Sequence, residues 1–206
     1  MVWVSPVASG QMGYLAWHEK PGYWGDVVRH FTPETRLLDV GCGGAWLGEH
    51  FERYTGVDVS AEAVEAARAR GREALQIEPG GSLPFEDESF DGVVLKDVLE
   101  HVADPVALVD EVRRVLRRGG RVFASSPDAQ RWVWDDYTHR RPFTRKSFRL
   151  LFADRGFDVE RVGYESVMPG TSVVSRRTRR KRRPRALAAA AWLPVVRRNV
   201  WLVARR

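Results

Sequence analysis

The sequence predicts an α/β domain built on a mostly parallel sheet with crossover helices. Three observations support this fold class: an apolar strand runs into closely spaced glycines within residues 37–47, a second apolar strand ends at Asp58, and strand-like and helix-like segments alternate from Leu37 onward. Such alternation favours parallel strands joined by helices. At 206 residues and 44% hydrophobic content, the chain is long enough for one sizeable core.

Apolar periodicity and turn residues place the individual elements. We expect strands at 36–40, 55–58, 74–77, 90–95, 120–125, 157–165 and 199–204, and helices at 45–52, 61–70, 105–117 and 144–155. Ser60 is a suitable N-cap for the helix at 61–70. Gly119 and Gly120 are a suitable stop for the helix at 105–117.

The glycine-rich segment is the most informative part of the chain. Residues 37–47 read Leu-Leu-Asp-Val-Gly-Cys-Gly-Gly-Ala-Trp-Leu, which predicts a buried strand, a tight turn and the start of a helix. Glycine suits such a turn because it adopts positive φ angles and lets a ligand approach the backbone. The next strand ends in Asp58, about twenty residues after the first, at the spacing from which a carboxylate reaches a ribose diol. The pair predicts a nucleoside-binding domain.

Five segments follow one another in an order that identifies a family. They are residues 37–43 (Leu-Leu-Asp-Val-Gly-Cys-Gly), 56–60 (Gly-Val-Asp-Val-Ser), 83–85 with 89–91 (Leu-Pro-Phe and Ser-Phe-Asp), 99–102 (Leu-Glu-His-Val) and 114–120 (Arg-Val-Leu-Arg-Arg-Gly-Gly). In these segments the chain resembles the class I S-adenosylmethionine-dependent methyltransferases, of the bacterial "methyltransferase domain 11" type. The resemblance implies a Rossmann-like sheet of seven strands in the order 3-2-1-4-5-7-6, with helices on both faces and the last strand antiparallel.

The same resemblance implies S-adenosylmethionine as cofactor and assigns residues to it. The expected cofactor-binding residues are Asp39, Gly41, Cys42, Gly43, Asp58, Val59 and Lys96. Gly41 and Gly43 would approach the methionine and ribose, Asp58 would accept bonds from the ribose hydroxyls, and Asp39 would orient the turn or bind the amino group. Lys96 would pair with the methionine carboxylate or face the acceptor. The chain departs from the family pattern in having Ala45 at the third glycine, and only Glu78 near the usual adenine-binding acid.

The expected acceptor is a small molecule, a glycan or a lipid-linked compound, methylated on oxygen. A hydroxyl acceptor gains from a general base, and His139, within residues 135–140, has a suitable resting pKa. His139 is therefore the candidate catalytic residue. The alternative is structural, because Thr138 and His139 with the following Phe-Thr at 143–144 resemble a family segment that leads into the next helix. His101 is either packed in the core or at the edge of the pocket.

The amino-acid composition limits which kinds of site and which cellular location we expect. Cys42 is the single cysteine, so neither disulfides nor a cysteine-based metal site is expected, and no metal is assigned. We expect a cytoplasmic protein, because residues 1–10 lack the features of a signal peptide and no apolar run has the length of a membrane span.

The formal charge of +6 is concentrated, since eight of the ten residues at 176–185 are basic. This block, followed by an apolar stretch at 186–196, has three interpretations: a solvated loop, peripheral attachment to an anionic membrane through 176–198, or contact with nucleic acid. Nucleic acid is the least favoured, because no RNA-binding module accompanies the block.

We divide the chain into an N-terminal segment at 1–34 and a methyltransferase domain at 35–206 with a basic insertion at 171–198. The first segment is rich in aromatic residues (Tyr14, Trp17, Tyr23, Trp24, Phe31). They either pack against the core or form a lid over the pocket.

Two other functions remain open at this point. One is a nicotinamide-dependent Rossmann oxidoreductase, against which the segments after Asp58 argue. The other is a non-catalytic protein that keeps the cofactor fold, for which the poorly matched adenine region is the support.

Overall fold

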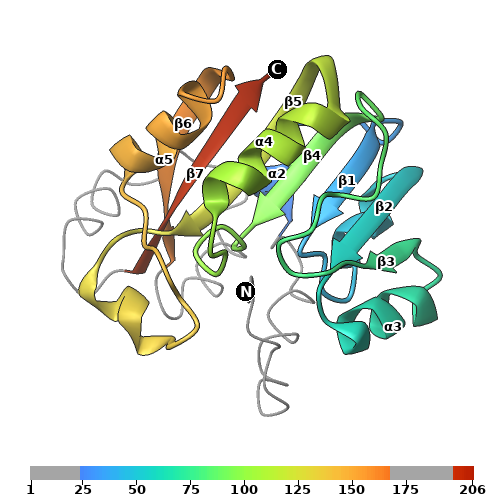
Figure 1. The fold of residues 1–206 in the computed structure, drawn as a ribbon, viewed down its shortest axis with the longest axis horizontal. Coiled ribbons are helices and arrows are strands. Elements are labelled where there is room, and N and C mark those ends of the chain that lie inside the picture. Colours follow the sequence, from blue (N-terminus) through green and yellow to red (C-terminus); the bar gives the residue numbers. More distant parts are fainter. Residues whose placement is uncertain (1–23, 168–196) are drawn as a thin grey trace, which may run out of the picture.

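The computed structural model describes residues 24–167 and 197–206 of the chain. In this part, seven strands form one sheet in the order β3-β2-β1-β4-β5-β7-β6 (Figure 1). The strands are β1 (Arg36–Val40), β2 (Arg53–Asp58), β3 (Ala74–Gln76), β4 (Phe90–Lys96), β5 (Leu116–Pro127), β6 (Asp158–Val167) and β7 (Arg197–Arg205). The helices are α2 (Gly25–Val28), α3 (Ala61–Ala69), α4 (Pro105–Val115) and α5 (Arg145–Ala153), with 3-10 turns η1 (Trp46–His50) and η2 (Arg131–Asp135).

The strand directions confirm the expected topology. The pairs β1–β2, β2–β3, β1–β4 and β4–β5 are parallel. β7 is antiparallel to both of its neighbours, with Pro127 opposite Asn199 on the β5 side and Val167 opposite Arg197 on the β6 side. The last strand is therefore inserted between the fifth and the sixth.

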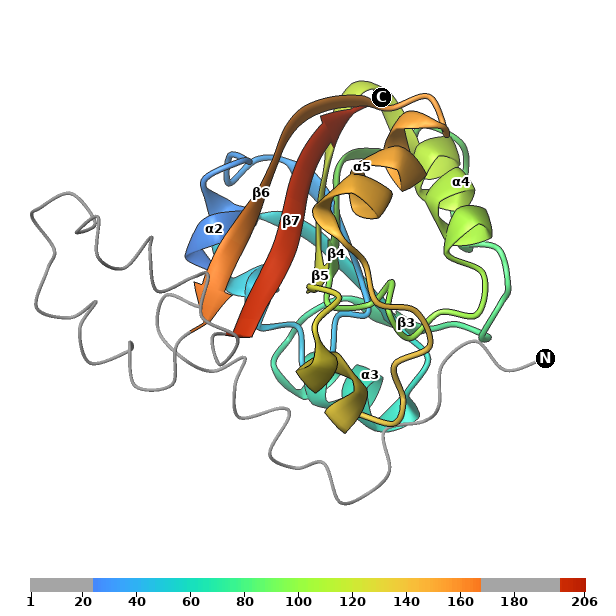
Figure 2. The same ribbon diagram turned by 90° about the vertical axis from the view of Figure 1, so that its left-hand side faces the viewer.

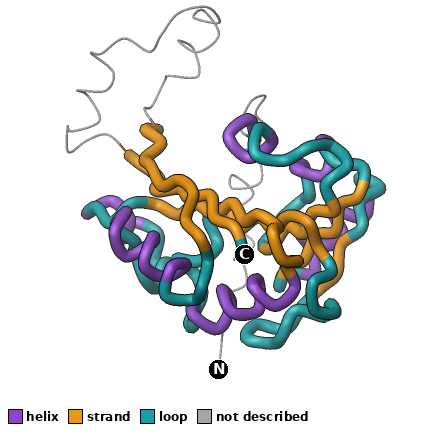
Figure 3. Tube along the Cα trace, turned by 90° about the horizontal axis from the view of Figure 1, so that it is seen from above, coloured by secondary structure: helices purple, strands orange, loops and turns teal. Residues whose placement is uncertain are grey.

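Apolar side chains form a cluster on each face of the sheet, because successive residues of a strand point to opposite faces. In β4, Val93 and Leu95 pack with α4 and α5, whereas Val94 packs on the other face with α3 and the turn η1. Figure 2 shows α4 and α5 on one side of the sheet and α2 on the other. Figure 3 shows the twisted sheet from above, with helices on both sides. Helices on both faces are thus confirmed.

The helices α3, α4 and α5 each begin directly after a residue whose side chain caps the first turn. The Ser60 hydroxyl accepts a hydrogen bond from the Ala63 amide at 3.2 Å, which confirms it as the N-cap of α3. Asp104 caps α4 in the same way, ahead of Pro105. Thr144 and Ser147 form a reciprocal capping box at the start of α5.

Two expected helices differ in the structure. The helix at 45–52 is wrong: Ala45 takes a left-handed conformation with φ of 57°, and Trp46–His50 forms only the 3-10 turn η1. Trp46 and Leu47 in this turn are buried in the apolar cluster on the α3 side of the sheet. The helix at 105–117 ends early, at Val115, because Leu116 is fully buried and starts β5. Gly119, with φ of 76°, therefore lies within β5, beyond the helix, and does not stop it.

The functional edge of the sheet follows from its topology. Because β1, β2, β4 and β5 are parallel, the turns after them lie along one edge, where ligands bind in open α/β sheets. This is the lower edge in Figure 1, below which the long loop after β5 extends.

The basic block at 176–185, the apolar stretch at 186–196, and Tyr14, Trp17 and Tyr23 lie outside the described residues. In the described part, none of the helices has the length and apolar character needed to cross a membrane.

Candidate functional site

The glycine turn after β1 is held against the end of β2. The amides of Gly41 and Cys42 both donate to the carbonyl oxygen of Val57, at 2.8 and 3.1 Å. Gly41 has φ of 74°, and a Cβ atom at this position would lie 2.5 Å from Cγ2 of Val98. Any other residue here would combine backbone strain with a steric clash, so the turn requires glycine. Gly41 itself is exposed.

Asp58 is fixed at the end of β2 by two backbone donors. The Gly43 amide donates to Oδ2 and the Ser60 amide to Oδ1, each at 2.9 Å. Burial raises the pKa of Asp58 from its usual 3.8, while these two bonds act in the opposite direction. Each carboxylate oxygen keeps a lone pair for a further donor. Asp58 is therefore an oriented acceptor beside the turn, and Val59 follows it in a partly buried position.

Asp39 and Cys42 lie beneath the turn. The Asp39 carboxylate is buried and accepts a hydrogen bond from the Tyr54 hydroxyl at 2.8 Å. Burial raises the pKa of Asp39 to about 7. The Cys42 thiol packs against Gly56, where a Cβ atom would lie 2.7 Å from Sγ, and burial raises the pKa of this thiol well above its usual value. Both side chains shape the turn from inside the protein.

Lys96 ends β4 on the same face as Asp39. Its side chain is buried, and Nζ lies 6.0 Å from the centre of the Trp24 ring. Trp24 and Phe31 both belong to the apolar cluster on this face, which supports the packing interpretation for the described end of the N-terminal segment. The structure therefore places Lys96 next to residues that lead in from the N-terminal segment.

A second group of polar side chains forms where the loops after β4 and β5 meet. The amides of Arg140 and Arg141 donate to the carbonyl oxygen of Glu100, at 2.7 and 3.2 Å. This contact brings His139 beside His101, with their ring centres 4.7 Å apart. The candidate base His139 therefore lies beside His101, for which the sequence allowed either a place in the core or one at the edge of the pocket.

His139 is oriented by its own loop. Its Nδ1 lies 2.6 Å from the carbonyl oxygen of Val133, and its side chain is 8% exposed. Because a carbonyl only accepts, Nδ1 carries a proton, and in the neutral imidazole the lone pair lies on Nε2. Nε2 lies 3.8 Å from Oδ2 of Asp136. His139 thus presents a proton-accepting atom within the cluster.

Glu100 is the residue that sequence reasoning missed. Its side chain is fully buried, and neither carboxylate oxygen has a hydrogen-bond partner among the described residues. Burial, with the nearby charge of Asp97, raises the pKa of Glu100 well above its usual value. The available signal was an acid between the apolar Leu99 and His101, in a turn at the functional edge. The resemblance identified the family from this segment but assigned the acid no role.

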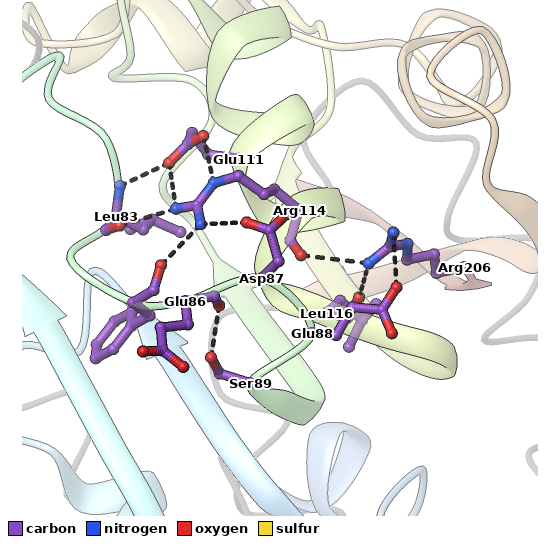
Figure 4. Close-up of polar contacts among 10 residues, drawn as sticks. Leu83, Glu86, Asp87, Glu88, Ser89, Glu111, Arg114, Leu116 and Arg206 are labelled. Atoms are coloured by element: carbon purple, nitrogen blue, oxygen red, sulfur yellow. Dashed lines mark hydrogen bonds and ion pairs between the residues drawn. The ribbon is translucent and has the colours of Figure 1, made fainter.

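The loop before β4 is tied to α4 through Arg114, as Figure 4 shows. The Arg114 guanidinium donates to the carbonyl oxygens of Leu83 and Phe85, at 2.9 and 2.7 Å, and also pairs with Glu111 and Asp87. Two of the family segments read in the sequence therefore meet through one side chain. The Leu-Pro-Phe loop is fixed by its backbone, which positions the chain between β3 and β4.

The Arg206 side chain extends the same network. It bonds to the carbonyl oxygens of Arg114 and Leu116 and pairs with Glu88 at 3.2 Å (Figure 4). The end of β7 is thereby joined to the end of α4.

Comparison with known proteins finds related methyltransferases. Residues 38–124 match the family described as "Methyltransferase domain" (Methyltransf_11). The chain is 31% identical over 116 residues to an uncharacterized protein of Methanocaldococcus jannaschii, covering 56% of each chain. It is 38% identical over 101 residues to "Ubiquinone biosynthesis O-methyltransferase" of Xanthomonas oryzae, covering 44% of this chain and 42% of that protein. The chain thus spans about half the length of these relatives.

Among solved structures, the S-adenosylmethionine-dependent methyltransferase of Mesorhizobium loti has a similar fold. The TM-score is 0.68 at 20% sequence identity, and the match covers 92% of this chain and all of the other. The structural similarity supports the fold. The matched family supports S-adenosylmethionine as the cofactor. Residues 38–124 are thus similar to the class I methyltransferase domain, and the fold of the described residues is like that of an S-adenosylmethionine-dependent methyltransferase.

Proposed function

We propose that the protein transfers a methyl group from S-adenosylmethionine to a hydroxyl group of a small-molecule, glycan or lipid-linked acceptor. The observation that carries this proposal is the Asp58 carboxylate, held by Gly43 and Ser60 beside an exposed, side-chain-free Gly41. The relative in Xanthomonas oryzae is called an O-methyltransferase, which supports oxygen as the acceptor atom.

The residues present fit the cofactor. Gly41 is exposed, so a ligand can lie against its main chain on the side away from Val98. Asp58 keeps acceptor capacity for two ribose hydroxyls after its bonds to Gly43 and Ser60. The amides of Gly41 and Cys42 are already bonded to Val57, so the turn offers its Cα and carbonyl groups to the methionine portion. When bound, S-adenosylmethionine supplies a methyl group on a positively charged sulfur.

The acceptor side is assigned to the loops after β4 and β5. Displacement of a methyl group in line with its leaving group depends chiefly on positioning, and a hydroxyl acceptor must also lose its proton. We assign assistance in that loss to His139, whose Nε2 lone pair faces away from the Val133 carbonyl. His139 is a proposed catalytic residue on this basis.

Two further assignments concern residues outside the described part. We propose that the part of the 1–34 segment before Trp24 forms a lid over the pocket. The support is its aromatic residues, together with the position of Trp24 beside Lys96 at the end of β4. We also propose that the protein is cytoplasmic and that its segment at 176–198 contacts anionic membranes peripherally. The support is the sequence: basic residues next to an apolar, helix-prone stretch.

Binding and turnover separate the proposed function from its alternatives. Titration with S-adenosylmethionine and with NADH tests the nicotinamide oxidoreductase, because we expect saturable binding of the first alone. Formation of S-adenosylhomocysteine with a cell extract as acceptor source tests the non-catalytic alternative. Binding of NADH in place of S-adenosylmethionine would refute the proposal, and cofactor binding without turnover would favour the non-catalytic protein.

A further inference from the structure

The cluster of Glu100, His101 and His139 has the geometry of a ligand set. One donor atom from each of the three side chains lies within 4.8 Å of the other two. Glu100 and His101 come from the turn after β4, and His139 comes from the loop after β5. The backbone bonds from Arg140 and Arg141 to Glu100 hold the two loops together without using the three side chains.

Glu100 is a second, independent sign of a missing partner. Its carboxylate is fully buried, and neither oxygen has a described partner at good hydrogen-bond geometry. The Ser126 hydroxyl and the Glu100 backbone lower the pKa of this carboxyl, but burial outweighs them and the pKa is raised. Buried carboxylates are ordinarily paired, hydrogen-bonded or bound to a metal, because burial of an unpaired charge is costly. The described residues supply two imidazoles at this point and no cationic side chain bonded to the carboxylate.

Hydrogen bonds at Nδ1 fix the position of both imidazoles and determine which nitrogen remains available. His139 donates its Nδ1 proton to the Val133 carbonyl oxygen. Thr138 uses its single hydroxyl proton in a bond to Asp136 at 2.6 Å, so His101 Nδ1, 3.0 Å from the Thr138 oxygen, is the donor in that contact. Each ring therefore keeps its lone pair on Nε2. Metal-binding histidines are typically fixed in this way, with the other nitrogen donating to a carbonyl or to a carboxylate network.

We propose that Glu100, His101 and His139 bind a divalent transition-metal cation. Two imidazoles and one carboxylate suit cations such as Zn²⁺, Fe²⁺ or Co²⁺ better than Mg²⁺ or Ca²⁺, which prefer oxygen ligands. Three protein ligands leave open positions for water or a substrate oxygen. This site departs from the expectation, drawn from the sequence, that the protein has no metal.

The cation would take part in the proposed methyl transfer, and this role rests on that function. A hydroxyl group at an open position ionises more readily, because the cation lowers its pKa. Its O–H bond breaks and the proton passes to solvent water, after which the oxygen forms a bond to the methyl carbon. The carbon–sulfur bond breaks, and its electron pair stays on a sulfur that becomes neutral. His139 would then assist proton loss as a ligand, with Nε2 on the cation.

The test uses untagged, full-length protein that has been freed of metal with a chelator. Titration with Co²⁺ alone, followed by its visible absorption, should show one saturable site. Zn²⁺ should compete for it, and Mg²⁺ at the same concentration should not. Glu100→Gln and His139→Gln should each weaken Co²⁺ binding at least tenfold. Thr138→Val, which removes the contact that orients His101, should weaken it by about 10–100-fold.

His50→Gln is the matched control, because His50 is exposed on η1 and outside the cluster; it should bind Co²⁺ as the parent does. S-adenosylmethionine affinity is measured on every variant and should not change. Retained affinity for S-adenosylmethionine without Co²⁺ binding, or equal Co²⁺ binding by the parent and both ligand variants, would overturn the metal site alone. If the parent protein itself does not bind S-adenosylmethionine, the proposed function is overturned instead.

Discussion

Replacing Asp58 by alanine should weaken S-adenosylmethionine binding and leave the fold intact. The carboxylate accepts two backbone bonds at 2.9 Å and retains lone pairs that we assign to the ribose hydroxyls. Hydrogen bonds to a charged group contribute about 1.5–3 kcal/mol each, and an unpaired buried group costs about 1–3 kcal/mol. Asp58 is only partly buried, so water replaces some of the lost contacts. We therefore expect a net loss of about 1–3 kcal/mol in binding free energy, or roughly 5–150-fold in Kd.

Asparagine at this position separates charge from shape. Asp58→Asn keeps the volume, but its NH₂ group must face one of the two N–H donors of Gly43 and Ser60. It should therefore also bind S-adenosylmethionine more weakly than the parent. Glu62→Ala is the control, because Glu62 is an exposed acid in the first turn of α3 nearby.

Isothermal titration calorimetry with S-adenosylmethionine measures these affinities, and circular dichroism melts verify folding. An Asp58→Ala protein that is folded and binds S-adenosylmethionine as tightly as the parent would refute the assignment of the cofactor site.

Four other predictions test separate parts of the molecule. Arg114→Ala should lower the free energy of unfolding by about 1–3 kcal/mol in urea denaturation, because it frees two loop carbonyls. Arg117→Ala, which breaks an exposed ion pair with Asp91, should cost less than about 1 kcal/mol, and equal losses would contradict the role of Arg114. Burial raises the pKa of Asp39 from 3.8 to about 7, so the folded protein holds a proton that the unfolded chain releases in this window, and stability should fall as pH rises through it. Asp39→Asn should reduce this fall in melts at mildly acidic and mildly alkaline pH, and an unchanged pH profile would show that Asp39 does not titrate there. His139→Gln should lower kcat about 100-fold and leave S-adenosylmethionine affinity unchanged, whereas normal turnover by a stable variant would make His139 a packing residue. The protein should sediment with anionic liposomes at low salt and be released by high salt, since each basic residue near such a surface contributes about 1 kcal/mol; equal sedimentation with neutral lipid, or none, would refute membrane contact, and retention on RNA would favour nucleic acid.

Much of the sheet was predictable because its strands are buried and apolar. β1 agrees with the expected bounds, since four consecutive buried residues end at a required glycine. The strand order came from the family resemblance, because pairing between distant strands leaves no local signal. The failure at 45–52 has a local cause: Ala45 adopts a left-handed conformation that its residue type does not predict.

In the candidate site, too, positions set by local sequence were predictable, and positions set by contacts between distant segments were not. Asp58 and Gly41 were predictable because a turn and a strand end determine their places. Asp39 was expected to orient the turn or to bind the amino group, and Cys42 to bind the cofactor. The side chains of both lie beneath the turn, and residue order alone does not say to which side of a turn a side chain points. The approach of Glu100 to His101 and His139 depends on two loops meeting, and only the folded structure shows it.

The pairing of β6 with β7 has a consequence for how this protein can diversify. Val167 and Arg197 lie opposite each other in the ladder, so the sheet itself closes the connection at 168–196. Closure entropy grows only slowly, by about 0.6 kcal/mol for each doubling of loop length. That connection leaves the sheet at the same edge as the turn after β5, because Pro127 pairs with Asn199. Insertions and deletions between these strands can therefore accumulate beside the site, where they can alter what the protein recognises at little cost to the sheet.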